Sequence, residues 1–463
     1  ASGFDNDVLG YNSMESSTNQ SLETGAWEEN SISYMARLNY ACNNRYLLTA
    51  TFRRDGYSGF GSNNKFGNFP SLALGWIASE EDFLTQIQWL DFLKFRISYG
   101  LNGNQGIGRY ASVVSLQSEV VYVYDGETAI GVAPSKIGND DLSWESTAST
   151  NIGVDCTIFD QRISGQIDIY SAKTSDVLVI RTLPRATGYA SVWDNLGGIK
   201  NKGIEIGLET WNIKSQLFNW KTKFVFSLNR NKLTKLYEGV TEDIGNKWFV
   251  GHPITAQYDY TVDGVWQEQD LFDGNILTGY YPGQYKLKDL SGEGKISTDD
   301  RSVIGYSEPN YRFGINNSFS YNRLSLSFFL NTIQGGDGYY IGENYNVVVA
   351  AGSIETGYRT NRTTIRPYWT PDNPVNNAPA MFYNTSIAHG VYEEKSFIRL
   401  QDVTVTYDVN KMTLLNNLGL FNLQVYLSGK NLHTWTKWSG WDPELENGGY
   451  PMRSIICGIK MSF

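Results

Sequence analysis

The sequence has no long apolar run, which excludes a helical membrane span. None of its 463 residues belong to anything near the roughly 18 to 20 consecutive apolar residues that such a helix needs. Cysteine is scarce: Cys42, Cys156 and Cys457 are widely spaced and form no CxxC motif, so neither a disulfide framework nor a cysteine metal site is predicted. Basic charge is also in deficit. The net charge is −10, so we expect no basic patch for phosphates, and this argues against nucleic acid as a partner.

Strand-forming residues, in contrast, are abundant. Aromatic residues make up 14% of the chain, and they favour β-strands. Composition alone favours a large soluble all-β protein. The pattern along the chain favours a different kind of all-β protein.

The last ten residues show this pattern most clearly. Their apolar face consists of Ile455, Cys457, Ile459, Met461 and the terminal Phe463. The opposite face carries Ser454, Gly458, Lys460 and Ser462. In a transmembrane barrel one face of each strand meets lipid and the other a polar lumen. A chain ending on an aromatic residue at the apolar face is typical of the closing strand of an outer-membrane β-barrel.

The same alternation recurs along the chain and predicts about thirteen strands of a transmembrane antiparallel β-barrel. The runs are 33–41, 46–53, 72–76, 93–99, 147–156, 162–172, 203–210, 220–230, 313–320, 324–330, 403–409, 421–428 and 454–463. Positions such as Leu74, Ile97, Val405 and Val425 are predicted to face lipid, and Gln424 the lumen.

Connections between the runs alternate between short and long. Short links follow Tyr40, Cys156, Ser320 and Val409. Long links rich in Gly, Asn, Tyr and Asp occupy about 54–70, 102–143, 173–200, 232–311, 333–396 and 432–453. Short periplasmic turns and long extracellular loops have this arrangement. Segment 79–91 falls on the periplasmic side, where we expect a short helix capped by Ser79 with Asp82 at its third position.

Strand direction indicates that part of the barrel wall lies elsewhere. The first and last predicted strands both run towards the periplasm, so they cannot pair antiparallel with each other. The chain also begins at Ala1 without a signal peptide. We therefore expect residues 1–463 to be the C-terminal portion of a longer barrel protein with long extracellular loops.

Several motifs resemble those of SusC-like TonB-dependent outer-membrane transporters. They occur in family order over nearly the whole chain, at 45–56, 69–76, 93–104, 142–147, 201–205, 289–305, 396–400 and 428–432. The resemblance implies a multi-pass barrel of about twenty-two strands in the cell outer membrane. It also implies an N-terminal plug domain and a SusD-like lipoprotein that closes over the extracellular mouth. Neither the plug nor a TonB-interacting segment is visible here, so coupling to TonB is expected to lie on a segment not in this chain.

The resemblance implies active import of oligosaccharides or, less favoured, of peptides. Aromatic and amide side chains suit both kinds of solute. Candidate loop residues are Tyr280, Tyr281, Tyr339, Tyr340, Tyr345, Trp369, Tyr383, Trp435, Trp438 and Trp441. Each also fits loop packing, an interfacial belt or the lipoprotein interface, so no substrate-binding residue is singled out.

One loop has the spacing of an EF-hand calcium site. Oxygen ligands fall at the expected positions, with Gly294 at the turn; the predicted ligands are Asp289, Ser291, Glu293, the Lys295 carbonyl, Ser297 and Asp300. Against calcium, a serine replaces one carboxylate and Asp300 is shorter than the usual Glu. Weak Ca²⁺ binding and an ion-free ordered turn both remain open, and no other cofactor is predicted.

Enzymatic function is not predicted. The three histidines, His252, His389 and His433, lack metal-ligand spacing, and GxSxG, HExxH and GxxxxGK[ST] motifs are absent from the sequence. An outer-membrane hydrolase would need a Ser/His or Asp/His pair at the rim, which His389 or His433 alone does not establish. A passive porin and a surface adhesin are the non-enzymatic rivals, and barrel architecture alone does not distinguish them from an active transporter.

Overall fold

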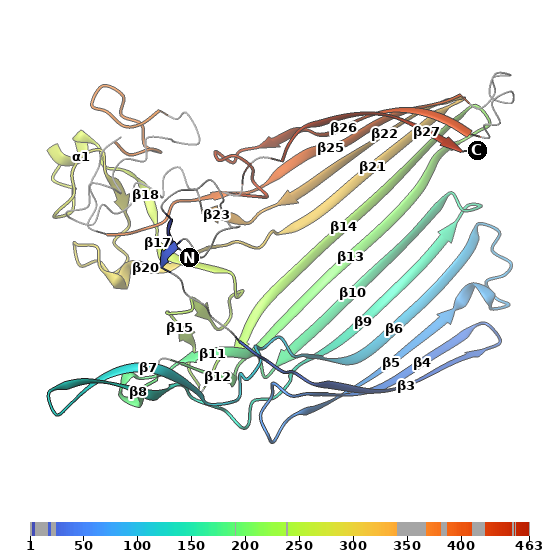
Figure 1. Ribbon diagram of the computed structural model, residues 1–463. Coiled ribbons are helices and arrows are strands. Elements are labelled where there is room, and N and C mark those ends of the chain that lie inside the picture. Colours follow the sequence, from blue (N-terminus) through green and yellow to red (C-terminus); the bar gives the residue numbers. More distant parts are fainter. Residues whose placement is uncertain are drawn as a thin grey trace.

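Thirteen antiparallel strands form one large sheet, in which neighbours in space are mostly neighbours in sequence (Figure 1). The computed structural model describes residues 2–4, 17–19, 25–189, 191–237, 239–339, 367–380, 387–409, 422–446, 449 and 451–462. From one edge to the other the strands are β3 (Ser31–Cys42), β4 (Tyr46–Tyr57), β5 (Phe66–Ile77), β6 (Leu90–Asn104), β9 (Glu145–Ile158), β10 (Ile163–Ser175), β13 (Gly198–Lys214), β14 (Phe218–Lys235), β21 (Tyr311–Tyr321), β22 (Leu324–Gln334), β25 (Phe397–Asp408), β26 (Asn422–Thr436) and β27 (Ser454–Ser462).

These strands confirm the thirteen runs predicted from alternation. Most are longer than their runs, so the loop expected at 54–70 shrinks to residues 58–65. Phe421 and Phe463, at the ends of two predicted runs, lie outside the described residues. No helix among the described residues is long and apolar enough to cross a membrane.

Cross-strand register gives the sheet one apolar face. Directly paired residues form a continuous apolar row across eight strands: Tyr40, Leu48, Leu74, Ile97, Ile152, Ile169, Ile204 and Leu228. One residue along, the paired positions of the opposite face include Arg96, Gly153, Asp168, Glu205, Ser227 and Arg312. Because side chains alternate along each strand, these two rows define an apolar face and a polar face for the whole sheet.

Aromatic residues cluster on the apolar face near the short turns. Trp76 stacks on Phe95 and Trp220 on Phe319, each with ring centroids 5.6 Å apart. The Trp220 indole N–H also donates to Asn317 at 2.9 Å. Rings with an apolar body and a hydrogen-bonded polar end are typical of the boundary between hydrocarbon and water.

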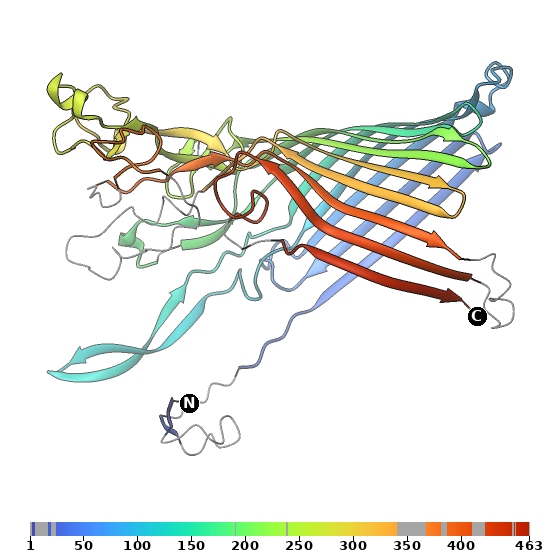
Figure 2. The ribbon, with the colours of Figure 1, turned by 90° about the horizontal axis from the view of Figure 1, so that it is seen from above.

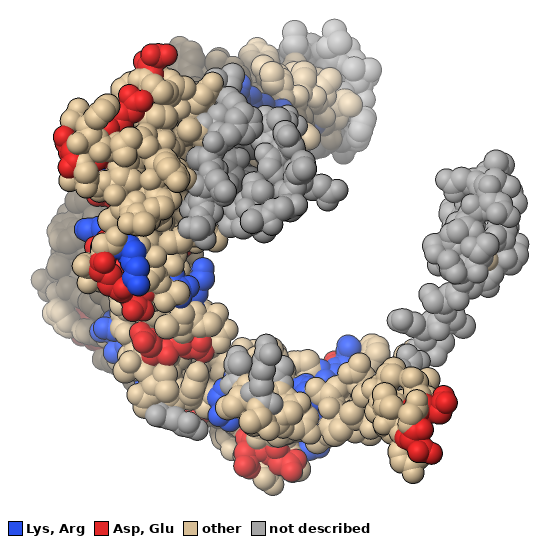
Figure 3. All heavy atoms as spheres, turned by 90° about the vertical axis from the view of Figure 1, so that its left-hand side faces the viewer, with Lys and Arg blue, Asp and Glu red and all other residues tan. Residues whose placement is uncertain are grey.

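The sheet bends around a hollow and stays open along one side. The strands cross in a tilted array, with short turns at one end and loops at the other (Figure 2). Seen end-on, the wall forms an incomplete ring (Figure 3). The two edges are β3 and β27, and no described strand pairs with the outer side of either. With thirteen alternating strands, these two edges run in the same direction.

Small elements decorate the loop end of the sheet. They are the paired strands β1 (Ser2–Phe4) with β2 (Ser17–Asn19), β7 (Ser115–Tyr124) with β8 (Glu127–Lys136), β11 (Leu178–Thr182) with β12 (Ser191–Asn195), β15 (Glu242–Asp243) with β16 (Trp248–Phe249), β17 (Ala256–Tyr260) with β20 (Arg301–Tyr306), β18 (Val262–Val265) with β19 (Tyr285–Leu287), and β23 (Asp337–Tyr339) with β24 (Tyr392–Glu394). Helix α1 spans Glu268–Phe272, and 3-10 turns lie at Arg185–Thr187 and Thr298–Asp300.

The prediction of a helix at 79–91 was wrong. A single 3-10 turn, η2 (Ala78–Glu80), begins after Ile77, and no side chain caps it. Glu81 instead accepts hydrogen bonds from the Tyr46 hydroxyl at 2.6 Å and the Trp76 indole at 3.1 Å. Arg45 adds an ion pair to Glu81 at 3.1 Å. These bonds tie the segment to strands β4 and β5, which competes with helix formation.

The two-faced sheet predicts different responses to charge at adjacent positions. Ile167 on the apolar face is 46% exposed and pairs with Ile206, whereas Gln166 lies on the polar face. In the complete protein, Ile167→Arg should cost about 2 to 4 kcal/mol of folding free energy in lipid vesicles, and Gln166→Arg much less. Denaturant titration measures both. Equal costs would contradict the facing of strand β10.

Candidate functional site: the polar wall and its loops

A cluster of paired charges lies on the polar face of β6, β9 and β10. The Arg96 guanidinium donates to both oxygens of Asp155 at 2.8 and 2.9 Å and to both oxygens of Asp168 at 3.0 Å. Gly153 lies directly beneath, where an added Cβ would come within 2.5 Å of Asp168 Oδ1 and 2.7 Å of Arg96 Cζ. The missing side chain lets the guanidinium lie against the wall. Further along, Lys223 pairs with Glu209 at 3.0 Å, so these wall charges neutralise one another.

A depression of about 300 Å³ opens in the polar face between β13, β14, β21 and β22. Gly207 and Gly314 form part of its floor, and a Cβ on Gly314 would come within 2.8 Å of the Phe329 ring and 3.2 Å of Val225. Its polar lining includes Gln166, Glu205, Arg312 and Asn331. An aromatic ring beside amides and two opposite charges can stack against a solute and hydrogen-bond its edges.

Two long loops pack together at the end of the sheet away from the short turns. Val265, Tyr285 and Trp369 form their shared core. The Trp369 indole donates to Gln267 Oε1 at 2.8 Å, and the Ala380 amide donates to the Gly283 carbonyl at 2.7 Å. The loop after β14 and the loop after β22 therefore form a single packed module, seen beside α1 in Figure 1.

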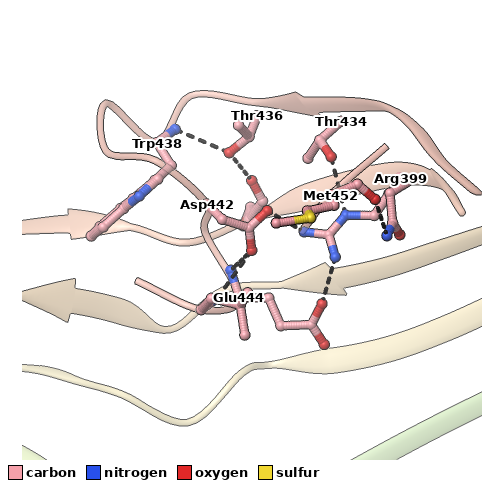
Figure 4. A network of polar contacts seen from close by, with 10 residues as sticks. Arg399, Thr434, Thr436, Trp438, Asp442, Glu444 and Met452 are labelled. Atoms are coloured by element: carbon pink, nitrogen blue, oxygen red, sulfur yellow. Dashed lines mark hydrogen bonds and ion pairs between the residues drawn. The ribbon is translucent and has the colours of Figure 1, made fainter. Parts of the chain in front are cut away.

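The loop after β26 folds back onto the polar face around one buried arginine. Arg399, 4% exposed, donates to Asp442 Oδ2 at 2.6 Å, to Glu444 Oε2 at 2.8 Å and to the Thr434 hydroxyl at 3.0 Å (Figure 4). The other oxygen of Asp442 accepts the backbone N–H groups of Glu444 and Leu445, each at 3.0 Å. The network closes the loop against the ends of β25 and β26.

The aromatic residues singled out from the sequence lie in different settings. Trp369 and Trp438 are buried and pack within loops. Trp435 pairs with Ile398 on the apolar face, so it belongs to that face rather than to the polar wall. Tyr281, Tyr339 and Trp441 are exposed, and burial raises the pKa of Tyr280 to about 12. Tyr340, Tyr345 and Tyr383 lie outside the described residues.

The two aspartates among the predicted calcium ligands accept hydrogen bonds from backbone amides of the same loop. Asp289 accepts the N–H groups of Gly292 and Gly294, each at 2.7 Å. Fully buried Asp300 accepts the N–H groups of Leu290 and Ser291 at 2.8 Å and of Ser297 at 2.7 Å. Burial opposes ionisation of Asp300, but these hydrogen bonds outweigh it and hold its pKa below the usual range.

Two other predicted ligands pair within the same loop. Glu293 forms an ion pair with Lys295 at 3.2 Å and contacts the Ser297 hydroxyl at 3.5 Å. Across the described part of the chain, no group of three or more His, Cys, Asp or Glu side chains is placed to hold a metal. Calcium at this loop stays a prediction, because an ion would have to exchange these amide hydrogen bonds for coordination.

The histidines are held by local contacts. His389 is 5% exposed, and its Nδ1 lies 3.1 Å from the Ile387 carbonyl oxygen, while burial lowers its pKa. The His433 ring packs against Trp435 at 4.6 Å, and His252 Nδ1 lies 3.0 Å from the Tyr306 hydroxyl. These contacts give no support to a hydrolase.

The structured elements within the long loops were not predicted from the sequence, although one of them carries a clear sequence signal. The hairpin of β7 and β8 extends well beyond the rest of the sheet (Figure 1) and turns at Asp125 and Gly126, with φ of 53° and 78°. A strand pattern around an Asp-Gly pair is a strong hairpin signal, and residues 120–132 contain it. The hairpin lies within the long interval 102–143, which was expected to be one loop.

The family is decided by comparison with known proteins. A family model described as TonB dependent receptor-like, beta-barrel, matches residues 2–432. The chain belongs to the TonB-dependent receptors. This confirms the resemblance stated from its motifs, and it places the receptor in the outer membrane. The apolar face of the sheet is therefore the lipid-facing surface and the polar face the lumen wall. The family consists of receptors and transporters rather than enzymes.

Individual relatives agree with this family. TonB-dependent receptor P26 of Formosa agariphila is 32% identical over 100% of this chain and 49% of its own length. TonB-dependent receptor SusC of Bacteroides thetaiotaomicron is 28% identical over 93% of this chain and 44% of its own length. The RagAB peptide importer in its open-open state superposes with a TM-score of 0.79 at 26% identity, over 100% of this chain and 50% of that one. The chain thus spans about half the length of these relatives.

Removing the buried arginine should release the loop after β26. Arg399→Gln leaves Asp442, only 3% exposed, without its ion-pair partner, and breaking such a buried pair costs about 3 to 5 kcal/mol. Hydrogen exchange in the complete receptor should then rise at 437–446. Arg453→Gln, at an exposed arginine in the same loop, is the control. Unchanged exchange in Arg399→Gln would show that the ion pairs do not hold the loop.

The calcium-like loop should lose order in acid. Because the folded pKa of Asp300 is depressed, its stabilisation is fully present above the unfolded value of about 3.9. It is lost only as the pH falls through the lower folded value. Hydrogen exchange at 289–300 should therefore rise below about pH 4, and Asp300→Asn should show raised exchange already at pH 7. Calcium that protects the wild-type loop but not Asp289→Asn would establish the ion site; no protection at millimolar calcium would exclude it.

Proposed function

We propose that residues 1–463 are the C-terminal portion of the barrel of an active importer. It takes oligosaccharides from a SusD-like surface lipoprotein and releases them into the periplasm, with energy supplied through TonB. The plug, the remaining strands and the TonB contact are assigned to a segment not in this chain. Two findings support assigning these parts to another segment: the chain belongs to this family, and it covers only about half the length of each relative.

The lumen depression between β13 and β22 is the observation that carries the proposal. It places the Phe329 ring beside Gln166 and Asn331, on a wall where charges such as Arg96 with Asp155 and Lys223 with Glu209 form ion pairs. A sugar ring has an apolar face for stacking and hydroxyl edges for amides. The barrel wall can bind and release such a solute, but directional transport needs an external source of energy.

Peptides are the second candidate solute. The RagAB peptide importer is 26% identical to this receptor, and the depression also exposes the opposite charges of Glu205 and Arg312. Such a pair suits the charged ends and side chains of a peptide. A transporter specific for uncharged sugars does not need this pair of charges.

Uptake in intact cells that carry the complete receptor tests the proposal. Uptake of a defined oligosaccharide panel should disappear when the lipoprotein is deleted and when TonB is lost. Phe329→Ala should lower uptake several-fold, because aromatic contacts contribute about 0.5 to 1.5 kcal/mol beyond area burial. Phe328→Ala is the matched control, since Phe328 pairs with Val403 on the lipid face.

The outcomes distinguish an importer of sugars from its rivals. Uptake of a peptide panel in place of the oligosaccharides would make peptides the solute. Undiminished uptake of large solutes without TonB would make the protein a porin, and surface binding without any uptake would make it an adhesin.

A further inference from the structure

Five cationic side chains form a compact group on the lipid-facing surface near the long loops. They belong to two consecutive rows of directly paired residues on β10, β13 and β14. Lys173, Lys200 and Lys232 make one row, and Lys202 with Arg230 makes the next. Side chains at these positions share the face of Ile169, Ile204 and Leu228, because along each strand the positions of adjacent rows are i and i+2. We refer to the five as the basic rows. They correct the expectation, drawn from the net charge, that the chain has no basic patch, because net charge does not show which residues the register brings together.

The positive charges of the basic rows repel one another. Like charges directly opposite one another on neighbouring strands are destabilising, and here three lysines stand side by side. No ion pair joins any of the five to a carboxylate of the described residues. Arg230 donates through Nη1 to the backbone carbonyls of Asn310 at 2.6 Å and Asn229 at 2.9 Å, which fixes the side chain. The Glu308 carboxylate lies near enough to be influenced by the Arg230 charge, but the two groups form no ion pair. The basic rows therefore favour an anion from outside the described chain.

Directly below the basic rows the surface is hollowed. A depression of about 530 Å³ is lined by Lys200, Lys202 and Arg230 at one end and by Ile152, Ile169 and Leu228 at the other. Thr150 and Ser171 lie in the same paired row as Lys202 and Arg230, beside the cations. One surface site thus offers positive charge and hydroxyl groups at one end and an apolar floor at the other.

Depth in the membrane agrees with this order. Trp220 marks the aromatic belt at the periplasmic boundary. At about 3.3 Å per residue along a strand tilted by roughly 45°, Arg230 and Lys232 lie about 23 to 28 Å above Trp220. The apolar band of such barrels is about 25 Å tall. The basic rows consequently lie at the outer boundary of the hydrocarbon, where lipid headgroups begin.

We propose that the basic rows bind the phosphate group of a phosphorylated lipid in the outer leaflet. The phosphate lies against Lys200, Lys202 and Arg230, and an acyl chain covers Ile152, Ile169 and Leu228. A phosphate supplies the negative charge that the opposed lysines need. A soluble anion would use the cations but leave the apolar floor uncovered, so the site is assigned to a lipid. This lipid site does not depend on which solute the receptor imports.

Native mass spectrometry of the complete receptor in detergent tests the site. The probe is diphosphorylated lipid A, compared with the same lipid after removal of its phosphates. The site variant is Lys200→Gln with Lys202→Gln. The matched control is Lys430→Gln with Lys460→Gln, which removes the same charge from the lumen face of β26 and β27. Each lysine lost from the site should weaken binding of the phosphorylated lipid about fivefold, from the ~1 kcal/mol that a cation near a charged membrane contributes.

Four results decide the proposal. Equal binding by the site variant and wild type overturns it, as does an equal loss in the control, which would indicate a general charge effect. Full competition by inorganic phosphate at millimolar concentration overturns the lipid assignment in favour of a soluble anion. Melting temperature confirms that the variant is folded: without phosphorylated lipid it should melt at or above the wild-type temperature, because the repulsion is relieved, and added lipid should stabilise only the wild type.

Discussion

Backbone hydrogen bonding in lipid is the constraint on which the rest of this structure depends. An N–H or C=O group left unpaired in hydrocarbon costs several kcal/mol, so each strand within the sheet pairs on both sides over most of its length. Of the thirteen strands in the large sheet, only β3 and β27 lack a second neighbour among the described strands. These two edges run in the same direction. An antiparallel ring can therefore close only through an odd number of further strands, about nine if the whole ring has roughly twenty-two.

The same constraint separates the work of the two faces. Lipid contact requires a continuous apolar surface, which the paired row from Leu48 to Leu228 provides. The lumen face is then free to hold charge, and part of that charge forms ion pairs such as Arg96 with Asp155 and Asp168. In the depression that contains the Phe329 ring and the amides of Gln166 and Asn331, the wall can contact a solute. Where unpaired charge appears on the outer face, at the basic rows, a lipid headgroup is the natural counterpart.

Much of this architecture could be predicted from the sequence, because alternation is a local signal. Every strand of the sheet appears as a run of alternating residues, and the family resemblance rests on short motifs. What depends on distant contacts could not be predicted. Arg399 contacts Asp442, which is 43 residues away in the sequence. The basic rows can be recognised only once the register of three strands is known. The depression beside Phe329 is equally a product of register, since five strands contribute to it.

Local signals also failed where a neighbour competed with them. Segment 79–91 has a plausible cap in Ser79, yet Glu81 bonds to Tyr46 and Trp76 and holds the chain against the sheet. The EF-hand spacing at 289–300 is present, but the structure uses its two aspartates to accept backbone N–H groups. Spacing alone does not distinguish a carboxylate that binds an ion from one that orders a turn.

Closure of the ring is the central claim, and it can be tested directly. An electron cryomicroscopy map of the complete receptor in lipid nanodiscs would show which strands flank β3 and β27. Each edge should pair antiparallel with a strand from outside residues 31–462, and an odd number of strands should separate the two edges. Direct pairing of β3 with β27, or an even number of intervening strands, would contradict it.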